Sequence, residues 1–128
     1  MSTRETVDRF LDALGRLEEH EEVDPLVELF ADDVRVDTAT ATDALRGSDG
    51  ARKLWQEDRE LFRSVSSEFR NQVVEGDVAI LEWQRTAEGQ DGGDLSHPGV
   101  TVLEVDGDRI ARFAVYFDAA RLHVRKPG

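Results

Sequence analysis

The chain has 128 residues, 28 acidic and 16 basic side chains, a net charge of −12 and no cysteine. The missing cysteines exclude disulfides, thiolate metal sites and a cysteine nucleophile. The acidic balance, without any basic stripe, argues against nucleic acid and anionic membranes as partners. We expect one domain over residues 1–128 and, because no apolar run reaches the length of a membrane span or resembles a signal peptide, a cytoplasmic protein.

Helix signals come first along the chain. The segment Ser2–Glu5 has the pattern of a capping box, and apolar residues then recur at helical spacing as far as Leu17. Asp24 and Pro25 predict the N-cap and first turn of a short second helix, whose apolar residues extend to Phe30.

A strand and a third helix follow. Apolar and polar residues alternate over Val34–Thr38, which predicts a first strand. We expect a loop over residues 39–47 and then a helix capped by Ser48 or Asp49. Asp58 falls within the apolar stripe of this helix, where an apolar residue is expected.

The remainder of the chain has strand patterns. Strands are predicted over residues 69–74 and 78–86, followed by a loop over 88–94. A hairpin is predicted over 100–117, with Asp106 and Gly107 as its turn. The order of helices and strands predicts an α+β fold in which helices cover one side of an antiparallel sheet.

Alternation along the last strand predicts which side chains share a face. The inward set is Ala111, Phe113, Val115 and Phe117, and the other set is Ile110, Arg112, Ala114 and Tyr116. The residues expected on the outer face of the sheet are Leu81, Trp83, Ala114 and Tyr116. Such a face is too apolar for a small monomer to expose, so we expect a homodimer through it.

Three tracts carry a resemblance to a known family. They are R-F-L-D-A-L at residues 9–14, L-V-E-L-F-A-D-D-V-R-V-D at 26–37, and the tract from Pro98 to Leu122. Together they resemble the SnoaL-like branch of the nuclear transport factor 2-like superfamily. This resemblance implies a cone-like fold, in which a curved sheet wraps a long N-terminal helix around an internal pocket, and often a dimer. Members include polyketide cyclases, ketosteroid isomerases, limonene-epoxide hydrolases, dehydratases and binding domains.

The catalytic patterns of two such enzymes are absent from this chain. Where the ketosteroid-isomerase pattern has a tyrosine and an aspartate, this chain has Phe10 and Thr38. The three positions of the limonene-epoxide-hydrolase pattern are occupied by Glu82, Gln84 and Val115. Neither reaction is therefore supported by its usual residues.

The same alignment directs other polar residues into the pocket, namely Thr38, Asp58, Glu82, Gln84 and His97. We predict Asp58, Glu82 and His97 as catalytic acid–base groups, because a carboxyl group among apolar residues has a raised pKa. The alternatives are an Asp58 that reaches solvent, a Glu82 that faces outward and pairs with Arg85, and a His97 without a role. Clustering of the three residues would favour an enzyme, and dispersal would favour simple binding.

The predicted substrate-binding residues are Phe10, Thr38, Trp55, Phe62, Gln84, Phe113, Val115 and Phe117. His20, His97 and His123 lack the spacing of metal ligands, and the glycines near residue 90 form no phosphate-binding motif, so we expect neither metal nor cofactor. The prediction is a cofactor-independent cyclase, isomerase or dehydratase that applies general acid–base catalysis to an apolar carbonyl substrate. The alternative is a non-catalytic, dimeric ligand-binding module of the same fold.

Overall fold

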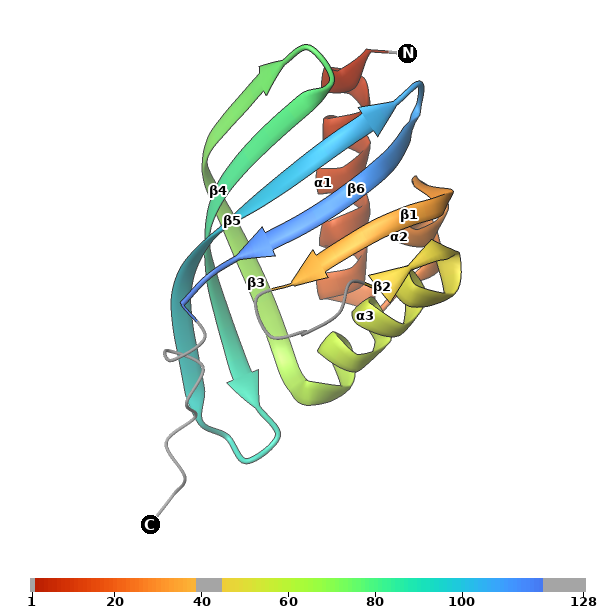
Figure 1. Cartoon of the computed structure of the whole chain (residues 1–128). Coiled ribbons are helices and arrows are strands. Elements are labelled where there is room, and N and C mark those ends of the chain that lie inside the picture. Colours follow the sequence, from red (N-terminus) through yellow and green to blue (C-terminus); the bar gives the residue numbers. More distant parts are fainter. Residues whose placement is uncertain (1, 39–44, 119–128) are drawn as a thin grey trace.

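The computed structural model of the protein describes residues 2–38 and 45–118, without the side chain of Asp58. Its elements are α1 (Thr3–His20), α2 (Asp24–Val27), β1 (Phe30–Thr38), β2 (Leu45–Arg46), α3 (Gly47–Leu61), β3 (Phe62–Glu75), β4 (Val78–Gly89), β5 (Asp94–Asp106) and β6 (Arg109–Tyr116). A curved sheet, in the order β2-β1-β6-β5-β4-β3, wraps around α1, while α3 lies beside β1 (Figure 1). The predicted α+β class and cone-like form are confirmed, although β1 runs parallel to β6.

Helix α1 begins as its sequence predicts. The Ser2 hydroxyl accepts a hydrogen bond from the amide of Glu5 at 3.1 Å, and the Glu5 side chain completes the capping box. The buried residues of the helix recur at helical spacing and are Thr6, Val7, Phe10, Ala13 and Leu17. Because these residues form one stripe, α1 turns a single apolar face toward the concave side of the sheet.

The second helix is shorter than predicted. Its N-cap is Val23 rather than Asp24, and no side chain caps it. The helix ends at Val27, and Phe30 begins β1 instead of closing the helix. Phe30 is only 1% exposed and pairs with Ile110 on β6, so its tertiary contacts override the helical spacing of the sequence.

Helix α3 begins earlier than Ser48 or Asp49. Arg46 is its N-cap, without a side-chain hydrogen bond, and pairs with Arg35 on β1 as part of the short strand β2. Gly47 has a φ of 74°, which lets the chain turn directly from β2 into the helix. Residues 39–44 of the predicted loop lie outside the described residues.

The last hairpin turns one residue later than predicted. Asp106 is still paired with Arg109, so Gly107 and Asp108 form the turn. Gly107 has a φ of 64°, whereas Asp106 keeps a negative φ. Glycine therefore supplies the left-handed conformation of this turn.

A bulge changes the alternation of β6. Arg112 pairs with Glu104 and Ile110 pairs with Val105, so Ala111 has no counterpart on β5. Ile110 consequently shares the inner face with Phe113 and is fully buried. The predicted placement of Ala111 inside and Ile110 outside is therefore wrong.

The faces of β4 are also reversed relative to the prediction. Leu81 and Trp83 are 0% and 7% exposed on the concave side, whereas Glu82 is exposed on the outer side and accepts a hydrogen bond from Asn71 at 2.6 Å. Residues 78–81 are apolar at every position, so the sequence of β4 does not itself indicate which face is inside. Tyr116, by contrast, lies outside, as predicted, and is 52% exposed.

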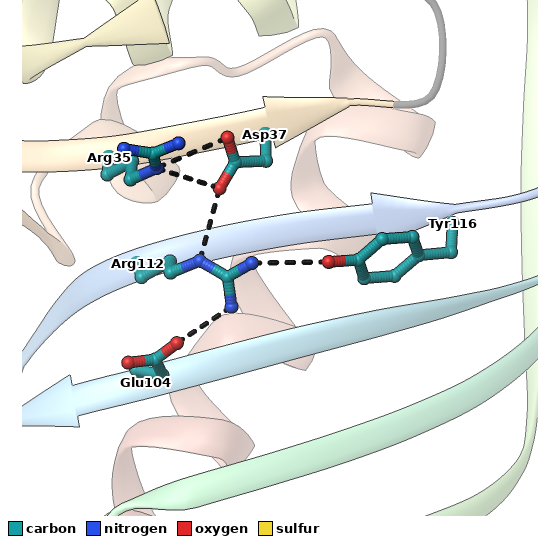
Figure 2. Close-up of polar contacts among 5 residues, drawn as sticks. All are labelled: Arg35, Asp37, Glu104, Arg112 and Tyr116. Carbon is teal, nitrogen blue, oxygen red and sulfur yellow. Dashed lines mark hydrogen bonds and ion pairs between the residues drawn. The ribbon is translucent and has the colours of Figure 1, made fainter. Parts of the chain in front are cut away.

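A charged network joins β1, β6 and β5 on the outer face (Figure 2). The Arg35 Nε donates to both carboxylate oxygens of Asp37, at 3.2 and 3.0 Å. Arg112 donates to Asp37 at 3.1 Å, to Glu104 at 2.7 Å and to the Tyr116 hydroxyl at 3.2 Å. These bonds connect the parallel pair β1–β6 to the antiparallel pair β6–β5.

The apolar interior has two parts. In the main cluster, the Phe113 ring lies 5.9 Å from Phe10, 5.7 Å from Phe30 and 5.3 Å from Trp55, measured between ring centroids. A smaller cluster, at the far end of β3, β4 and β5, consists of Phe62, Val65, Ala87 and Leu95. The candidate site lies between the two clusters.

Candidate functional site

A cavity of about 240 Å³ lies between α1, α3 and the concave face of the sheet. Its wall is mostly apolar, with aromatic rings from all three of these layers. The lining residues are Phe10, Leu14, Leu17, Glu18, Thr38, Leu54, Trp55, Leu61, Phe62, Ser67, Phe69, Trp83, Arg85, His97, Thr101, Phe113, Val115 and Phe117. Such a cavity, with few polar groups in an apolar wall, is typical of a small-molecule site.

One row of polar side chains crosses the concave face. Ser67 on β3 is directly opposite Arg85 on β4, and Arg85 is directly opposite His97 on β5. We call these three residues the polar row. The cross-strand rows on either side of it are apolar, Val65–Ala87–Leu95 and Phe69–Trp83–Gly99. Directly opposite side chains are close enough to interact, so the polar row brings a hydroxyl, a guanidinium and an imidazole together in the cavity wall.

His97 is the most deeply buried member of the polar row. It is 3% exposed, and its ring lies 5.5 Å from Trp83 and 5.2 Å from Phe117 between centroids. The sequence predicts a strand from residue 100, but β5 begins at Asp94, so His97 lies inside the strand. Proline is tolerated there because, among the described residues, positions 94–99 pair only with β4, so Pro98 has no second ladder to join in that part of the chain.

Arg85 and Ser67 are positioned by neighbouring side chains. The Arg85 guanidinium carbon lies 5.3 Å from the centroid of the Phe62 ring, a cation–π contact. The Glu18 carboxylate, which reaches in from α1, accepts hydrogen bonds from the Ser67 amide at 3.2 Å and hydroxyl at 2.6 Å. The helix therefore contributes an acidic group beside the polar row.

Two tryptophans also line the cavity. The Trp83 indole donates to the Thr101 hydroxyl at 2.9 Å and lies so close to Gly99 that a Cβ at position 99 would overlap the ring. The Trp55 indole nitrogen, in contrast, is buried and has no hydrogen-bond partner among the described residues. Glycine at position 99 is therefore required for the Trp83 ring to lie flat against β5.

The structure places most of the predicted binding residues in the cavity wall. These are Phe10, Thr38, Trp55, Phe62, Phe113, Val115 and Phe117. The prediction of Gln84 as a binding residue is corrected. Gln84 lies on the outer face, where its amide donates to Ser96 at 2.8 Å. Gln84 and Glu82 both follow the reversed alternation of β4, which directs even-numbered residues away from the cavity.

Of the three predicted acid–base residues, the structure places one in the cavity wall. His97 lines the cavity, the side chain of Asp58 is not among the described ones, and Glu82 is on the opposite face of the sheet. The prediction that Glu82 and His97 share one site is therefore corrected, because their side chains lie on opposite faces of the sheet. The sequence analysis missed Glu18 and Arg85. Arg85 lies two residues from both Trp83 and Ala87 and so shares their face, but its inward position follows only once the faces of β4 are known.

Two negative observations apply to the described residues. No group of three or more histidine, cysteine, aspartate or glutamate side chains within 2–38 and 45–118 could hold a metal ion. Across this same part of the chain, no helix combines the length and the hydrophobicity needed to cross a bilayer.

Together, the curved sheet, the enclosed helix and the cavity between them define a cone-shaped α+β protein with an internal pocket. The SnoaL-like domain profile matches residues 7–113. The chain belongs to this family. No curated protein is significantly similar in sequence.

Solved structures show the same fold at low sequence identity. An NTF2-like protein of unknown function from Burkholderia pseudomallei is 17% identical, with a TM-score of 0.84 over 95% of each chain. A putative SnoaL-like polyketide cyclase from Jannaschia sp. is 17% identical, with a TM-score of 0.77 over 94% of each chain. An epoxide hydrolase of the LEH-like type from M. tuberculosis is 18% identical, with a TM-score of 0.74 over 94% of this chain and 85% of that one.

Proposed function

We propose that the protein is a cofactor-independent enzyme of the cyclase, isomerase or dehydratase type, which applies general acid–base catalysis to an apolar carbonyl compound. The observation that carries this proposal is His97, buried in the cavity wall between two aromatic rings. Imidazole is the side chain best suited to take up and return a proton near neutral pH. Two similar structures are named as a polyketide cyclase and an epoxide hydrolase, so this fold also holds enzymes.

In the proposed reaction, the aromatic wall binds the apolar body of the substrate, and His97 removes a proton from the carbon next to the carbonyl group. The resulting enolate has three outcomes. Return of the proton from His97 to another carbon gives an isomer. Attack of the enolate on a second carbonyl closes a ring, and the new alkoxide oxygen takes the proton back from His97. Departure of a hydroxyl group from the neighbouring carbon, as water formed with the same proton, gives dehydration. Asp58, which the sequence predicts as an acid–base group, stays a predicted participant in this reaction.

A second candidate function is a binding module without chemistry. The observation that favours it is the position of Glu82, which lies on the outer face, away from the cavity that His97 lines. The residues at the ketosteroid-isomerase positions, Phe10 and Thr38, do line the cavity, but they do not supply the usual acid and base. In this alternative, the same wall binds a small molecule without changing it.

Deuterium exchange tests the proposal without knowledge of the natural substrate. A panel of apolar ketones and β-diketones is incubated with the protein in deuterated buffer, and exchange at the carbon next to the carbonyl is followed by NMR. We expect catalysed exchange that falls roughly 10²–10⁴-fold in His97→Gln, the range typical of a lost acid–base group. His20→Gln, at an exposed position near the end of α1, is the matched control and should retain the full rate. Compounds that bind but do not exchange would reject the enzyme in favour of the binding module.

A further inference from the structure

The inference concerns the chemical class of the molecule that the cavity takes, and it rests on the proposed function only in using the same site. Arg85 places a permanent positive charge in a wall that is otherwise mostly aromatic and aliphatic. Arg85 is half-buried, and taking even part of a guanidinium out of water is costly, so an apolar residue would fill this position of the row more cheaply. A charge kept at such a cost is a candidate for ligand recognition.

The surroundings of Arg85 hold it in place. Phe62 is 6% exposed and provides a fixed ring against the guanidinium, while the neighbouring strands fix the backbone on both sides. The other ionised group described in the wall, Glu18, has its two carboxylate oxygens engaged by the Ser67 amide and hydroxyl. A guanidinium has enough N–H donors to serve a protein partner and a ligand at the same time.

We infer that the cavity selects an organic anion, an apolar molecule with a carboxylate or an ionised enol or phenol oxygen, and that Arg85 is the residue that recognises this oxygen. Planar guanidinium groups match such oxygens with charge-assisted hydrogen bonds, which are stronger than neutral ones. The net charge of −12 repels anions at long range, so any preference for an anion must arise locally in the cavity.

The test compares two probes of nearly equal shape, 2-naphthoate and 2-naphthamide, by isothermal titration calorimetry at moderate salt. We expect the carboxylate to bind about tenfold or more tightly than the amide, as one charge-assisted hydrogen bond provides. In Arg85→Gln this preference should disappear through weaker binding of naphthoate alone. Arg85→Lys, which keeps the charge but loses the planar fork, should retain part of the preference and guards against misfolding of the first variant.

Arg63→Gln is the matched control. Arg63 is exposed on β3, where it bonds Glu88 at 3.2 Å, so the variant removes the same charge from the surface and should leave both affinities unchanged. Equal affinity for the two probes, failure of both to bind, or a preference that survives Arg85→Gln would overturn the inference. Anion selectivity without deuterium exchange would instead reject the proposed chemistry and support the inference, so the two failures are distinguishable.

Discussion

The two tryptophans of the chain differ in how their indole N–H groups are satisfied, and this difference predicts opposite consequences of the same substitution. Trp83→Phe leaves the buried Thr101 hydroxyl without its donor, so the free energy of unfolding should fall by about 1–3 kcal/mol beyond the loss of ring area. Trp55→Phe removes a buried N–H without a partner among the described residues, so this extra cost should be absent.

Urea unfolding of both variants checks the comparison, because each substitution replaces an indole by a phenyl ring and removes a similar volume. A Trp55→Phe variant that loses as much stability as Trp83→Phe would show that the Trp55 nitrogen contributes a bond to the folded state after all.

Single residues were predictable where one rule determines their position. Phe10 and Trp55 line the cavity because helical spacing specifies which side of a helix is apolar. Glu82 and Arg85 were misjudged because they lie on one strand, where a shift of one residue exchanges the two faces. Burial of a charge such as Arg85 also opposes the general preference for solvent, so composition rules assign it to the surface.

At the scale of elements, the order of helices and strands followed from the sequence, but the register did not. Strict alternation along β6 puts Ile110 and Arg112 on one face, whereas the bulge at Ala111 places them on opposite faces. A similar irregularity at Arg70 shifts β3 against β4. Strand pairing is decided by contacts between distant segments, so these shifts become visible only in the folded chain.

The pairing of β1 with β6 should depend on pH through Asp37. Hydrogen bonds from Arg35 lower the pKa of Asp37 below its ordinary value of 3.8; Arg112 lowers it further, and burial opposes them. Because the folded pKa is the lower one, the ionised carboxylate stabilises the fold above pH 3.8, and this contribution is lost as the pH falls through the folded pKa. The hydrogen bond that Arg112 donates to Glu104 raises the pKa of Arg112, which stays charged throughout.

Asp37→Asn tests this dependence. The difference in unfolding free energy between wild type and variant, measured by urea unfolding, should be largest at neutral pH and should shrink as the pH falls below 3.8. Asp33→Asn, an exposed position on the same strand, is the control for the loss of one carboxylate from β1. A constant difference for Asp37→Asn would mean that the network stabilises the sheet by shape rather than by charge.

At the scale of the whole molecule, the cone places its cavity and the exposed apolar residues of its sheet on opposite sides of that sheet. Odd-numbered residues of β4, such as Trp83 and Arg85, line the cavity, while Val78 and Ile80 face outward. The family resemblance predicted this arrangement as a whole, even though the individual faces of β4 were reversed. A cone has one concave side, so a correct fold still located the cavity when the register of a strand was wrong.

The outer face remains the surface through which we propose that two copies associate, with a corrected set of residues. Val73, Val78, Ile80 and Tyr116 are 55%, 39%, 44% and 52% exposed there, and Val73 is directly opposite Ile80. They provide the apolar surface that had been assigned to Leu81 and Trp83. An apolar sheet face of this kind is more typical of an interface than of a small monomer.

Sedimentation equilibrium at micromolar concentration should therefore show a dimer, and Ile80→Lys should convert it to a monomer because the lysine places a charge in the apolar contact. Leu61→Lys is the matched control, since Leu61 is 64% exposed at the end of α3, away from the outer face. Each chain carries −12, so added salt should strengthen the dimer by screening the repulsion between copies. A monomer at moderate salt, or an Ile80→Lys protein that still dimerises, would exclude this face as the interface.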